Sequence, residues 1–588
     1  MLLPIVVDHP PIDGPAHVKV AAFSSGFQLL VNGKPFLIKG SGGDGSKSLL
    51  ASCGANSFRT WGSDNLDNQL DEAQRLGLKV TIGIWLGHEE QGFHYDNASM
   101  VAQQFEMAKQ AILKYRNHPA VLMWGIGNEM EGYGAGDSPL IWKAVEDIAR
   151  FAKTTDPFHP TMTVIAEIGG KKVPSINRYC PDIDVIGINS YGGGASIPDR
   201  YRAIGGTKPY VMTEFGPPGV WELPKSSWGA AAEPTSTQKA EIYRNVYQKA
   251  VTGAPGLCLG SYAFTWGNKQ EATATWFGML LPGGAKLGPV DSMTELWSGK
   301  APTNKCPRID SLSISDPDDV TPGATIHAKL TASDPEGDPI SVKWVLQRET
   351  SAYGNNGASE AVPPTYPDAI ISGTLKGAEV KMPKESTGYR LFAYVSDSHG
   401  NGAVGNIALH VKKDSSQPET DATPLPFYVY QDNDKPMGYF ASGWMGDAKS
   451  MKIDLANTET PRSGSTCIRF DLKESNGWGS IAWQSPANDW GDKPGGYNLK
   501  GATRLTFWAR GAKGGESASF GVGLIAADKT YYDTTIAKLP EPTINRDWQQ
   551  FSIPLTGKDL SRIKTGFVMT LKANGAPVTI YLDDIRFE

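Results

Sequence analysis

Residues 121–132 read VLMWGIGNEMEG, and this stretch is the most informative point in the chain. An apolar run that is typical of a buried strand ends abruptly in Asn128 and Glu129. Either the strand simply ends in water, or the carboxylate of Glu129 lies at the edge of a sheet where chemistry takes place. The surrounding sequence distinguishes these two interpretations.

Short runs rich in Val, Ile and Leu alternate with amphipathic helical stretches throughout residues 25–300. The expected strands lie at 36–41, 55–61, 78–87, 120–129, 160–168, 183–191, 208–216 and 256–266. Such apolar runs are expected when helices cover both faces of a parallel sheet. The pattern and its length predict an α/β domain with a (β/α)8 TIM barrel. In addition, FQLLVNGKPF (27–36) predicts a hairpin with an Asn-Gly turn.

The helical pattern stops after Lys305, and two further domains are expected. Residues 306–413 show alternating strands with turn-rich joins, which predict a β-sandwich that resembles Ig-like and PKD-type modules. Residues 414–424 read as a polar linker. Residues 425–588 are again all β, with recurrent tryptophans, and resemble jelly-roll carbohydrate-binding modules. We therefore expect a multidomain chain with the barrel and its hairpin in residues 1–305.

Composition excludes several classes of protein. The net charge of -6 argues against nucleic acid as the main partner, and no apolar run approaches the length of a membrane span. The five cysteines are odd in number and lack metal-type spacing, so a disulfide scaffold is not expected. The N-terminal segment lacks the basic region of a complete signal peptide. We nevertheless expect a secreted, periplasmic or cell-surface protein, most simply a monomer.

In a TIM barrel the active site lies at the carboxyl ends of the strands. Two carboxylates stand there, Glu129 after the fourth expected strand and Glu214 at the end of the seventh. Other polar and aromatic residues end neighbouring strands and are candidate sugar contacts: Arg59, Trp61, Trp85, His88, Asn128, Tyr191 and Trp266. Trp276, in the long segment after the eighth strand, is a candidate stacking platform.

Glycoside cleavage needs one carboxyl group that protonates the leaving oxygen and a second that attacks or stabilises the anomeric carbon. Arg59 and Tyr191 are placed to donate hydrogen bonds that keep Glu214 ionised. No cation lies beside Glu129 in sequence, so it is the expected acid/base, and Asn128 is the expected partner of the sugar 2-hydroxyl. A plain structural role remains open for each of the polar candidates.

Four motifs occur in order at barrel-strand spacing: NGKPFLIKG (32–40), FRTWG (58–62), GNE (127–129) and TEFG (213–216). In these motifs the barrel resembles glycoside hydrolase family 2 and its clan A relatives. The resemblance implies Glu129 as acid/base and Glu214 as nucleophile of a retaining enzyme. Family 2 exo-enzymes usually carry β-sandwich domains before the barrel. Here the accessory domains follow it, which favours action on a polymer.

Three tryptophans in NGWGSIAWQSPANDWGD, namely Trp478, Trp483 and Trp490, suit a sugar-binding face, although packing inside the sheet is an alternative for at least one. Asp432, Asp434 and Asp584 are candidate ligands of a structural calcium ion, because hard cations prefer several oxygen ligands. No cofactor is expected for catalysis.

The sequence thus predicts a retaining β-glycosidase that cleaves a polysaccharide, with β-glucan as the favoured substrate. Other β-linked polymers, such as mannan or galactan, remain open. A transglycosylase would use the same two glutamates with a sugar hydroxyl in place of water. The alternative from another class is a non-catalytic carbohydrate-binding protein whose barrel has lost its catalytic activity.

Overall fold

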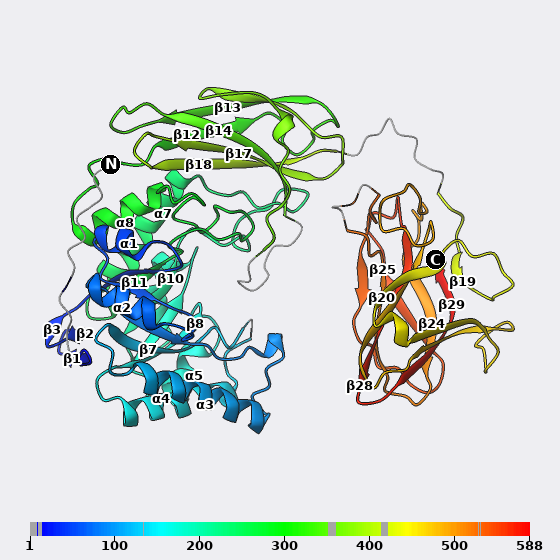
Figure 1. The fold of residues 1–588 in the computed structure, drawn as a ribbon, viewed down its shortest axis with the longest axis horizontal. Helices are drawn as coiled ribbons and strands as arrows, with labels where there is room; N and C mark the ends of the chain where they lie inside the picture. The colour runs from blue at the N-terminus through cyan, green and yellow to red at the C-terminus, as the bar shows by residue number, and fades with distance from the viewer. Residues whose placement is uncertain are drawn as a thin grey trace. The chain divides into compact units, whose positions relative to one another are not determined.

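The structure is a computed structural model that describes residues 9, 14–132, 134–350, 360–412, 422–526, 529 and 531–588. The chain divides into two compact units, Met1–Lys413 and Asp414–Glu588, which are described separately (Figure 1). The linker expected at 414–424 lies mostly outside the described residues. No helix in the described ranges is both long and apolar enough to cross a membrane.

The first unit contains the predicted barrel. Eight parallel strands close in chain order: β4 (Ile38–Gly42), β5 (Ser57–Arg59), β6 (Lys79–Ile84), β7 (Val121–Asn128), β8 (Thr161–Ala166), β9 (Val185–Asn189), β10 (Tyr210–Phe215) and β11 (Cys258–Phe264). The helices around them are α1 (Lys47–Ser52), α2 (Asp67–Arg75), α3 (Ala98–Tyr115), α4 (Pro139–Thr155), α5 (Lys172–Tyr179), α6 (Ile197–Ala203), α7 (Ser236–Val246) and α8 (Gly288–Ser298). The expected TIM barrel is confirmed.

The apolar runs form strands because both faces of the barrel wall are covered. Every residue of β7 is buried. One large core cluster lies between the strands and the surrounding helices. A second cluster joins strand-start residues such as Leu122 and Leu259 to the N-terminal hairpin, β1 (Val18–Phe23) and β2 (Gly26–Val31). The hairpin therefore closes the amino-terminal end of the barrel, opposite the expected active site.

The turn after β2 has the predicted Asn-Gly geometry. Asn32 and Gly33 adopt φ values of 49° and 77°, and the chain then pairs back through β3 (Lys34–Pro35). Positive φ at both positions is what a two-residue type I′ turn requires.

The rest of the first unit is a β-sandwich. One sheet has the order β12 (Arg308–Ile314), β13 (Thr325–Ser333), β16 (Gly377–Lys381) and β15 (Ile370–Thr374), and the other β14 (Ser341–Arg348), β17 (Gly388–Ser396) and β18 (Gly402–His410). A compact apolar cluster fills the space between the sheets. The sandwich lies against α7 (Figure 1), where Ser236 accepts from the Val404 amide and Thr237 from the Ile309 amide, at 3.0 and 2.9 Å.

The second unit is a larger sandwich with its own core. One sheet contains β21 (Met451–Asn457), β22 (Cys467–Leu472), β29 (Val578–Phe587), β24 (Arg504–Gly511) and β27 (Gln549–Pro554), with β19 (Phe427–Tyr430) paired to β29. The other contains β20 (Phe440–Gly446), β23 (Asn476–Gln484), β28 (Thr565–Asn574), β25 (Ser517–Val522) and β26 (Ala537–Leu539). The predicted all-β architecture is confirmed.

Candidate active site

The two glutamates stand at the carboxyl ends of β7 and β10, as expected from the sequence. Glu129 directly follows β7, and Glu214 is the next-to-last residue of β10. The backbone turns sharply at the end of β7, because Gly127 and Glu129 adopt φ values of 75° and 56°. A glutamate in the left-handed region is uncommon and costs conformational energy, which is often seen at functional sites.

Three side-chain hydrogen-bond donors surround the carboxylate of Glu214. Its Oε1 accepts from the Trp61 indole at 2.8 Å and from Arg59 Nη1 at 3.4 Å, and its Oε2 accepts from the Tyr191 hydroxyl at 2.7 Å. Burial, followed by the charge of Glu214, raises the pKa of Tyr191 well above its usual value, so the phenol stays protonated and donates. Donors on both oxygens stabilise a carboxylate in its ionised form.

Glu129 has the opposite environment. Burial of its carboxyl group, and then the negative charge of Glu214, raises the pKa of Glu129 to about 7. Its Oε1 accepts a hydrogen bond of 2.6 Å from Asn189 Nδ2. A carboxyl group that holds its proton near neutral pH can act as a general acid.

A buried polar network connects the two glutamates. Arg59 Nη2 donates to Asn128 Oδ1 at 2.9 Å, and Asn189 Nδ2 lies 3.3 Å from the same oxygen. Thr213 in turn donates to Asn189 Oδ1 at 2.7 Å. Asn189 was not among the candidate site residues, although its place at the end of the sixth barrel strand is the signal that identifies it.

Trp61, Trp85 and His88 lie near the carboxyl ends of the barrel strands, where the sequence analysis expected them. Trp61 contacts Glu214 directly and packs edge-to-face on Phe264, with ring centroids 5.8 Å apart. Trp85 is solvent-exposed and stacks on His88 at 5.0 Å. Burial is the main cause of a lowered pKa at His88, which favours its neutral ring. Trp85 and His88 thus form an aromatic pair after β6.

Two expected sugar platforms are wrong. Trp266 and Trp276 are both fully buried, and their indoles donate to the carbonyls of Ser46 and Pro218 at 2.9 and 3.0 Å. Neither ring can present a face to a substrate. Phe264, the last residue of β11, takes the place that was expected for Trp266 and packs against Trp61.

Trp221 is an aromatic candidate that the sequence analysis missed. Its side chain is 59% exposed, and its ring lies edge-to-face on Tyr191 with centroids 6.1 Å apart. The following residue, Glu222, accepts from the Gly192 amide at 2.9 Å, which ties this loop to the segment after β9. A large aromatic residue in a Pro/Gly-rich loop directly after Glu214 was the available signal.

In the second unit the tryptophans separate into two groups. Trp483 is fully buried in the core, so the sugar-binding role expected for it is wrong. Trp478 is 49% exposed and Trp490 half-buried. Trp444 is 37% exposed on the neighbouring strand β20, but it lies opposite the core residue Ile481 and stacks on Phe470 at 6.4 Å, so it is on the other face of the sheet from Trp478.

The candidate calcium ligands hold a loop in place. Asp432 Oδ1 accepts from the amides of Ser465 and Thr466, both at 2.9 Å, and Asp584 Oδ2 accepts from the Ser463 hydroxyl at 2.7 Å. Asp434 pairs with the adjacent Lys435. Among the described residues, no group of three or more His, Cys, Asp or Glu side chains is arranged to hold a metal ion. The calcium site stays a prediction.

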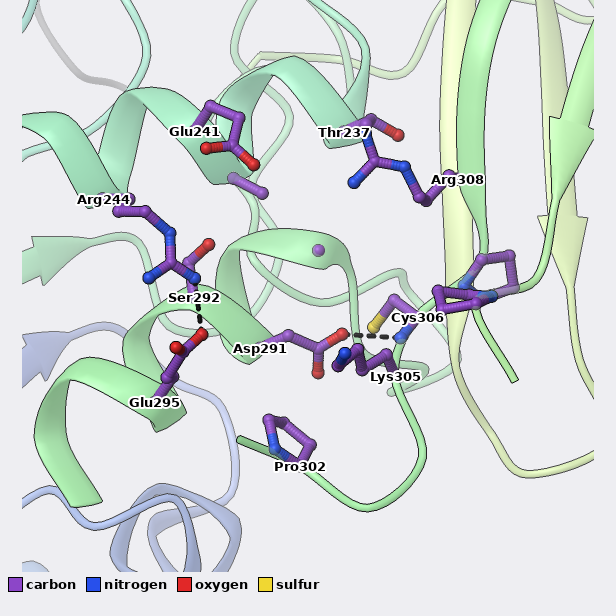
Figure 2. Close-up of a pocket in the computed structure, with 14 residues that line it drawn as sticks. Thr237, Glu241, Arg244, Asp291, Ser292, Glu295, Pro302, Lys305, Cys306 and Arg308 are labelled. Atoms are coloured by element: carbon purple, nitrogen blue, oxygen red, sulfur yellow. Dashed lines mark hydrogen bonds and ion pairs between the residues drawn. The ribbon is translucent and has the colours of Figure 1, made fainter. Parts of the chain in front are cut away.

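A separate cavity lies on the outside of the barrel, between α7, α8 and the segment that leads into β12 (Figure 2). Arg244 pairs with Glu295 across it at 2.7 Å, and Asp291 accepts from the Cys306 amide at 2.6 Å. No strand-end residue of the glutamate site lines this cavity. It is a domain-edge depression rather than the substrate site.

Each of the two units contains a region that is similar to a carbohydrate-active protein family. Residues 44–249 match the model for the TIM barrel domain of glycosyl hydrolases family 2, and residues 427–588 match the model for carbohydrate binding domain 30. Both catalytic candidates fall inside the first match. The resemblances inferred from the sequence motifs are therefore confirmed.

Curated relatives cover only part of the chain. A β-glucuronidase of Sus scrofa is 29% identical over 185 residues, which are 28% of this chain and 26% of the relative. A β-glucuronidase of Paenibacillus borealis is 24% identical over 258 residues, 38% and 42% of the respective chains. The chain thus matches less than half the length of these relatives. A solved β-glucuronidase of Dictyoglomus thermophilum shares 20% identity over 49% of this chain and 54% of its own, with a TM-score of 0.38.

Proposed function

We propose that this protein is a retaining β-glycoside hydrolase, with Glu129 as general acid/base and Glu214 as nucleophile. The observation that carries the proposal is the unequal environment of the two carboxyl groups. Glu214 receives donors on both oxygens, whereas burial and the charge of Glu214 raise the pKa of Glu129 to about 7. A retaining glycosidase needs this division into an ionised and a protonated carboxyl group.

The reaction proceeds in two displacements. In the first, Glu214 attacks the anomeric carbon while Glu129 gives its proton to the departing glycosidic oxygen, which leaves a covalent glycosyl-enzyme. In the second, Glu129, now ionised, takes a proton from water, and the water oxygen displaces Glu214 from the sugar. Tyr191 and Trp61 hold the nucleophile in position during both steps through hydrogen bonds of 2.7 and 2.8 Å.

β-Glucuronides are the first substrate class to test. The curated relatives are β-glucuronidases, and they are similar to this chain in its barrel. A uronic acid carries a carboxylate, which a cation would stabilise. Lys269, in the loop after β11, lies 5.6 Å from the centre of the Phe264 ring and pairs with Glu271 at 2.7 Å. Glu271 balances the charge of this lysine, so the similarity to β-glucuronidases, rather than Lys269, is the reason to test glucuronides first.

β-Glucan, the substrate favoured by the sequence analysis, is the second candidate. The observation in its favour is the exposed Trp478 on the outer face of β23, in a unit that matches carbohydrate binding domain 30. Flat aromatic faces suit the rings of a polymeric sugar. Action on such a polymer also fits a secreted or cell-surface location, which remains an expectation.

The test is hydrolysis of paired substrates by the full-length protein. Aryl β-D-glucuronide and aryl β-D-glucoside would be compared, followed by β-1,3-glucan, mixed-linkage glucan, mannan and galactan, with Glu214→Ala as control. Release from the glucuronide alone supports the first class, and release from a neutral polymer supports the second. Oligosaccharide products longer than the substrate would show transglycosylation. Equal rates for wild type and Glu214→Ala would refute the proposed function.

A further inference from the structure

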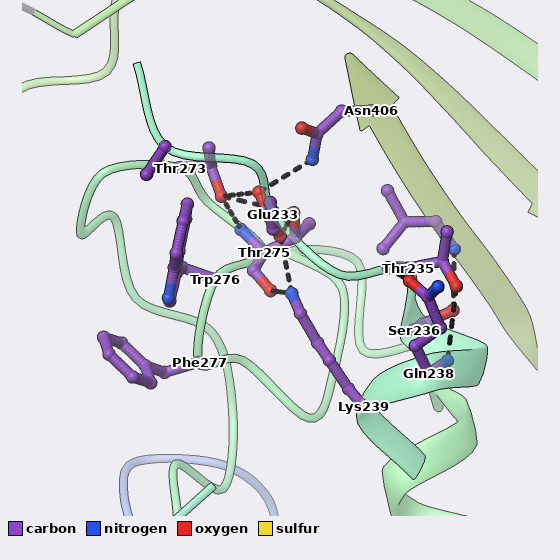
Figure 3. Close-up of polar contacts among 12 residues, drawn as sticks. Glu233, Thr235, Ser236, Gln238, Lys239, Thr273, Thr275, Trp276, Phe277 and Asn406 are labelled. Carbon is purple, nitrogen blue, oxygen red and sulfur yellow. Dashed lines mark hydrogen bonds and ion pairs between the residues drawn. The ribbon is translucent and has the colours of Figure 1, made fainter. Parts of the chain in front are cut away.

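Glu233, which plays no part in the proposed chemistry, is buried where the loop between β10 and α7 meets the loop after β11 (Figure 3). Its Oε2 accepts from the Thr273 hydroxyl at 2.7 Å, and its Oε1 accepts from the Thr275 hydroxyl at 2.9 Å. Lys239 Nζ, on α7, lies 2.5 Å from Oε1 and also donates to the Thr275 carbonyl at 2.6 Å. One carboxylate thus binds the loop after β11 to the helix α7.

Glu233, Lys239, Thr273 and Thr275 form a buried polar cluster, and the β-sandwich supplies its remaining contacts. Asn406 Nδ2, on β18, donates to Glu233 Oε2 at 2.7 Å. Asn406 is itself held by Arg390 on β17, whose Nη1 donates to Asn406 Oδ1 at 2.7 Å and whose Nη2 donates to the Ala231 carbonyl at 3.1 Å. Figure 3 shows Asn406 reaching the cluster from the sheet while Lys239 approaches from the helix.

A second contact joins the sandwich to the same loop. Glu360 Oε2 accepts from the Ala272 amide at 2.8 Å, and the Glu360 amide donates to the Gln270 carbonyl at 3.2 Å. Backbone groups of Gln270 and Ala272 and the hydroxyls of Thr273 and Thr275 are therefore bonded to groups outside the loop after β11.

The bonded loop carries aromatic residues of the glutamate site. Phe277 follows Thr275 by two positions and packs on Tyr191 at 5.1 Å and on Phe264 at 5.5 Å. Tyr191 in turn donates to Glu214. A contiguous set of contacts thus leads from Asn406 of the sandwich to the hydrogen bond on the nucleophile.

Charge balance explains why the cluster is costly to disturb. Burial alone would raise the pKa of Glu233, but the charges of Lys239 and Arg390 outweigh it and hold that pKa below its usual value. Glu233 and its partner Lys239 are both buried, and Arg390 is paired with Glu349 at 2.8 Å, so removing one partner of either ion pair leaves an uncompensated charge in a low-dielectric interior. Fully satisfied buried networks of this kind fix one arrangement of the groups around them.

We propose that Glu233 is a positioning residue for the active site, and that the β-sandwich, through Asn406 and Glu360, is a working part of the catalytic unit. The sandwich holds the loop in which Phe277 packs against Tyr191. Tyr191 in turn orients the carboxylate of the nucleophile Glu214 through its hydrogen bond. This inference rests on the proposed glycosidase function. A sandwich that only lengthened or stabilised the chain would not need polar contacts to this particular loop.

The test compares two identical substitutions in the sandwich of the full-length protein. Asn406→Ala removes the contact to Glu233. Asn401→Ala removes another buried asparagine, which bonds Asp397 and Asn304 and does not touch the cluster. For Asn406→Ala we expect kcat/KM to fall about tenfold, the factor for one ordinary hydrogen bond. In a plot of kcat/KM against pH, the loss of activity on the acidic side (the acidic limb) should begin at a higher pH than in the wild type. Asn401→Ala should lower Tm without moving that limb.

Thr273→Val tests the same carboxylate from the loop side, because it removes a hydroxyl donor with little change in volume. It should reproduce the upward shift of the acidic limb. The conservative Glu233→Gln variant should give a larger loss than either, and where it fails to fold the two milder variants still decide. An unchanged pH profile in both Asn406→Ala and Thr273→Val would overturn the positioning role.

Hydrogen exchange supplies a readout that needs no activity. Exchange of amides in residues 270–280 should rise in Asn406→Ala and stay at the wild-type level in Asn401→Ala. Unchanged exchange in Asn406→Ala would overturn the link between sandwich and loop even in an active enzyme. If the wild type hydrolyses no β-glycoside, the proposed function fails by itself, while the exchange comparison still decides whether the sandwich holds the loop.

Discussion

At the scale of single residues, the division of labour between Glu129 and Glu214 follows from what surrounds each carboxyl group. Glu214 receives Trp61 and Tyr191 as donors, whereas Glu129 receives one amide from Asn189 and feels the charge of Glu214. Proton affinity is set by burial, neighbouring charge and hydrogen bonding together. The two environments therefore suit the same residue type to the two different roles that we propose.

Replacing Glu129 with Gln should remove the general acid and its titration. We expect kcat on substrates with poor leaving groups to fall about 10²–10⁴-fold, with a smaller loss on activated aryl glycosides. In the wild type, activity should decline as pH rises through about 7, because Glu129 then loses the proton it must donate. That basic limb should vanish in Glu129→Gln and persist in Glu90→Gln, which alters an exposed carboxylate after β6.

The raised pKa of Glu129 also predicts a stability effect of the same substitution. Its pKa rises from 4.5 to about 7 on folding, so the folded state binds the proton more tightly and stability falls as pH rises through this window. Gln cannot ionise and avoids that cost. We expect the Tm of Glu129→Gln to exceed that of wild type by roughly 2–4 °C at pH 8 and to match it near pH 4. Calorimetry showing the same difference at both pH values would contradict this linkage.

At the scale of elements, the sequence predicted the positions of the strands better than it predicted which side chains at their ends face the site and which are buried. Most of the barrel strands were recognisable because they are apolar runs buried on both sides, as β7 is. β11 ends at Phe264, two residues before its expected end. Trp266 therefore lies beyond the strand and turns into the core, while Phe264 packs at the site. Sequence order shows where a strand approaches its end, but packing decides which ring remains exposed.

The loop after β10 carries the exposed ring that the sequence analysis missed, and its role can be measured. Trp221→Ala removes an aromatic face beside Tyr191, so we expect KM to rise about three- to tenfold with little change in kcat. Trp228→Ala is the matched control, because Trp228 lies in the same loop but bonds Asp318 and stacks on His410 of the sandwich. Equal changes in KM for the two variants would indicate a general effect of disturbing the loop.

At the scale of the whole molecule, the residues proposed for catalysis and those proposed for polymer binding belong to separate compact units with separate cores. The glutamate site is built entirely from the first unit, and the exposed Trp478 belongs to the second. Composition and periodicity predicted this order of architectures along the chain. They could not predict that the sandwich bonds the loop after β11, because that contact joins Ala272 to Glu360 across 88 positions of sequence.

Separation of the two proposed functions gives a prediction for the variant Trp478→Ala. Trp478 offers an exposed flat face that would be lost, so binding to an insoluble β-glucan should weaken about tenfold in a pull-down assay. Values of kcat/KM on a soluble aryl glycoside should be unchanged, because Trp478 lies outside the first unit. Trp508→Ala, on β24 of the opposite sheet, controls for loss of any half-buried indole. If that control weakens polymer binding equally, the sugar-binding face is not the one formed by β20 and β23.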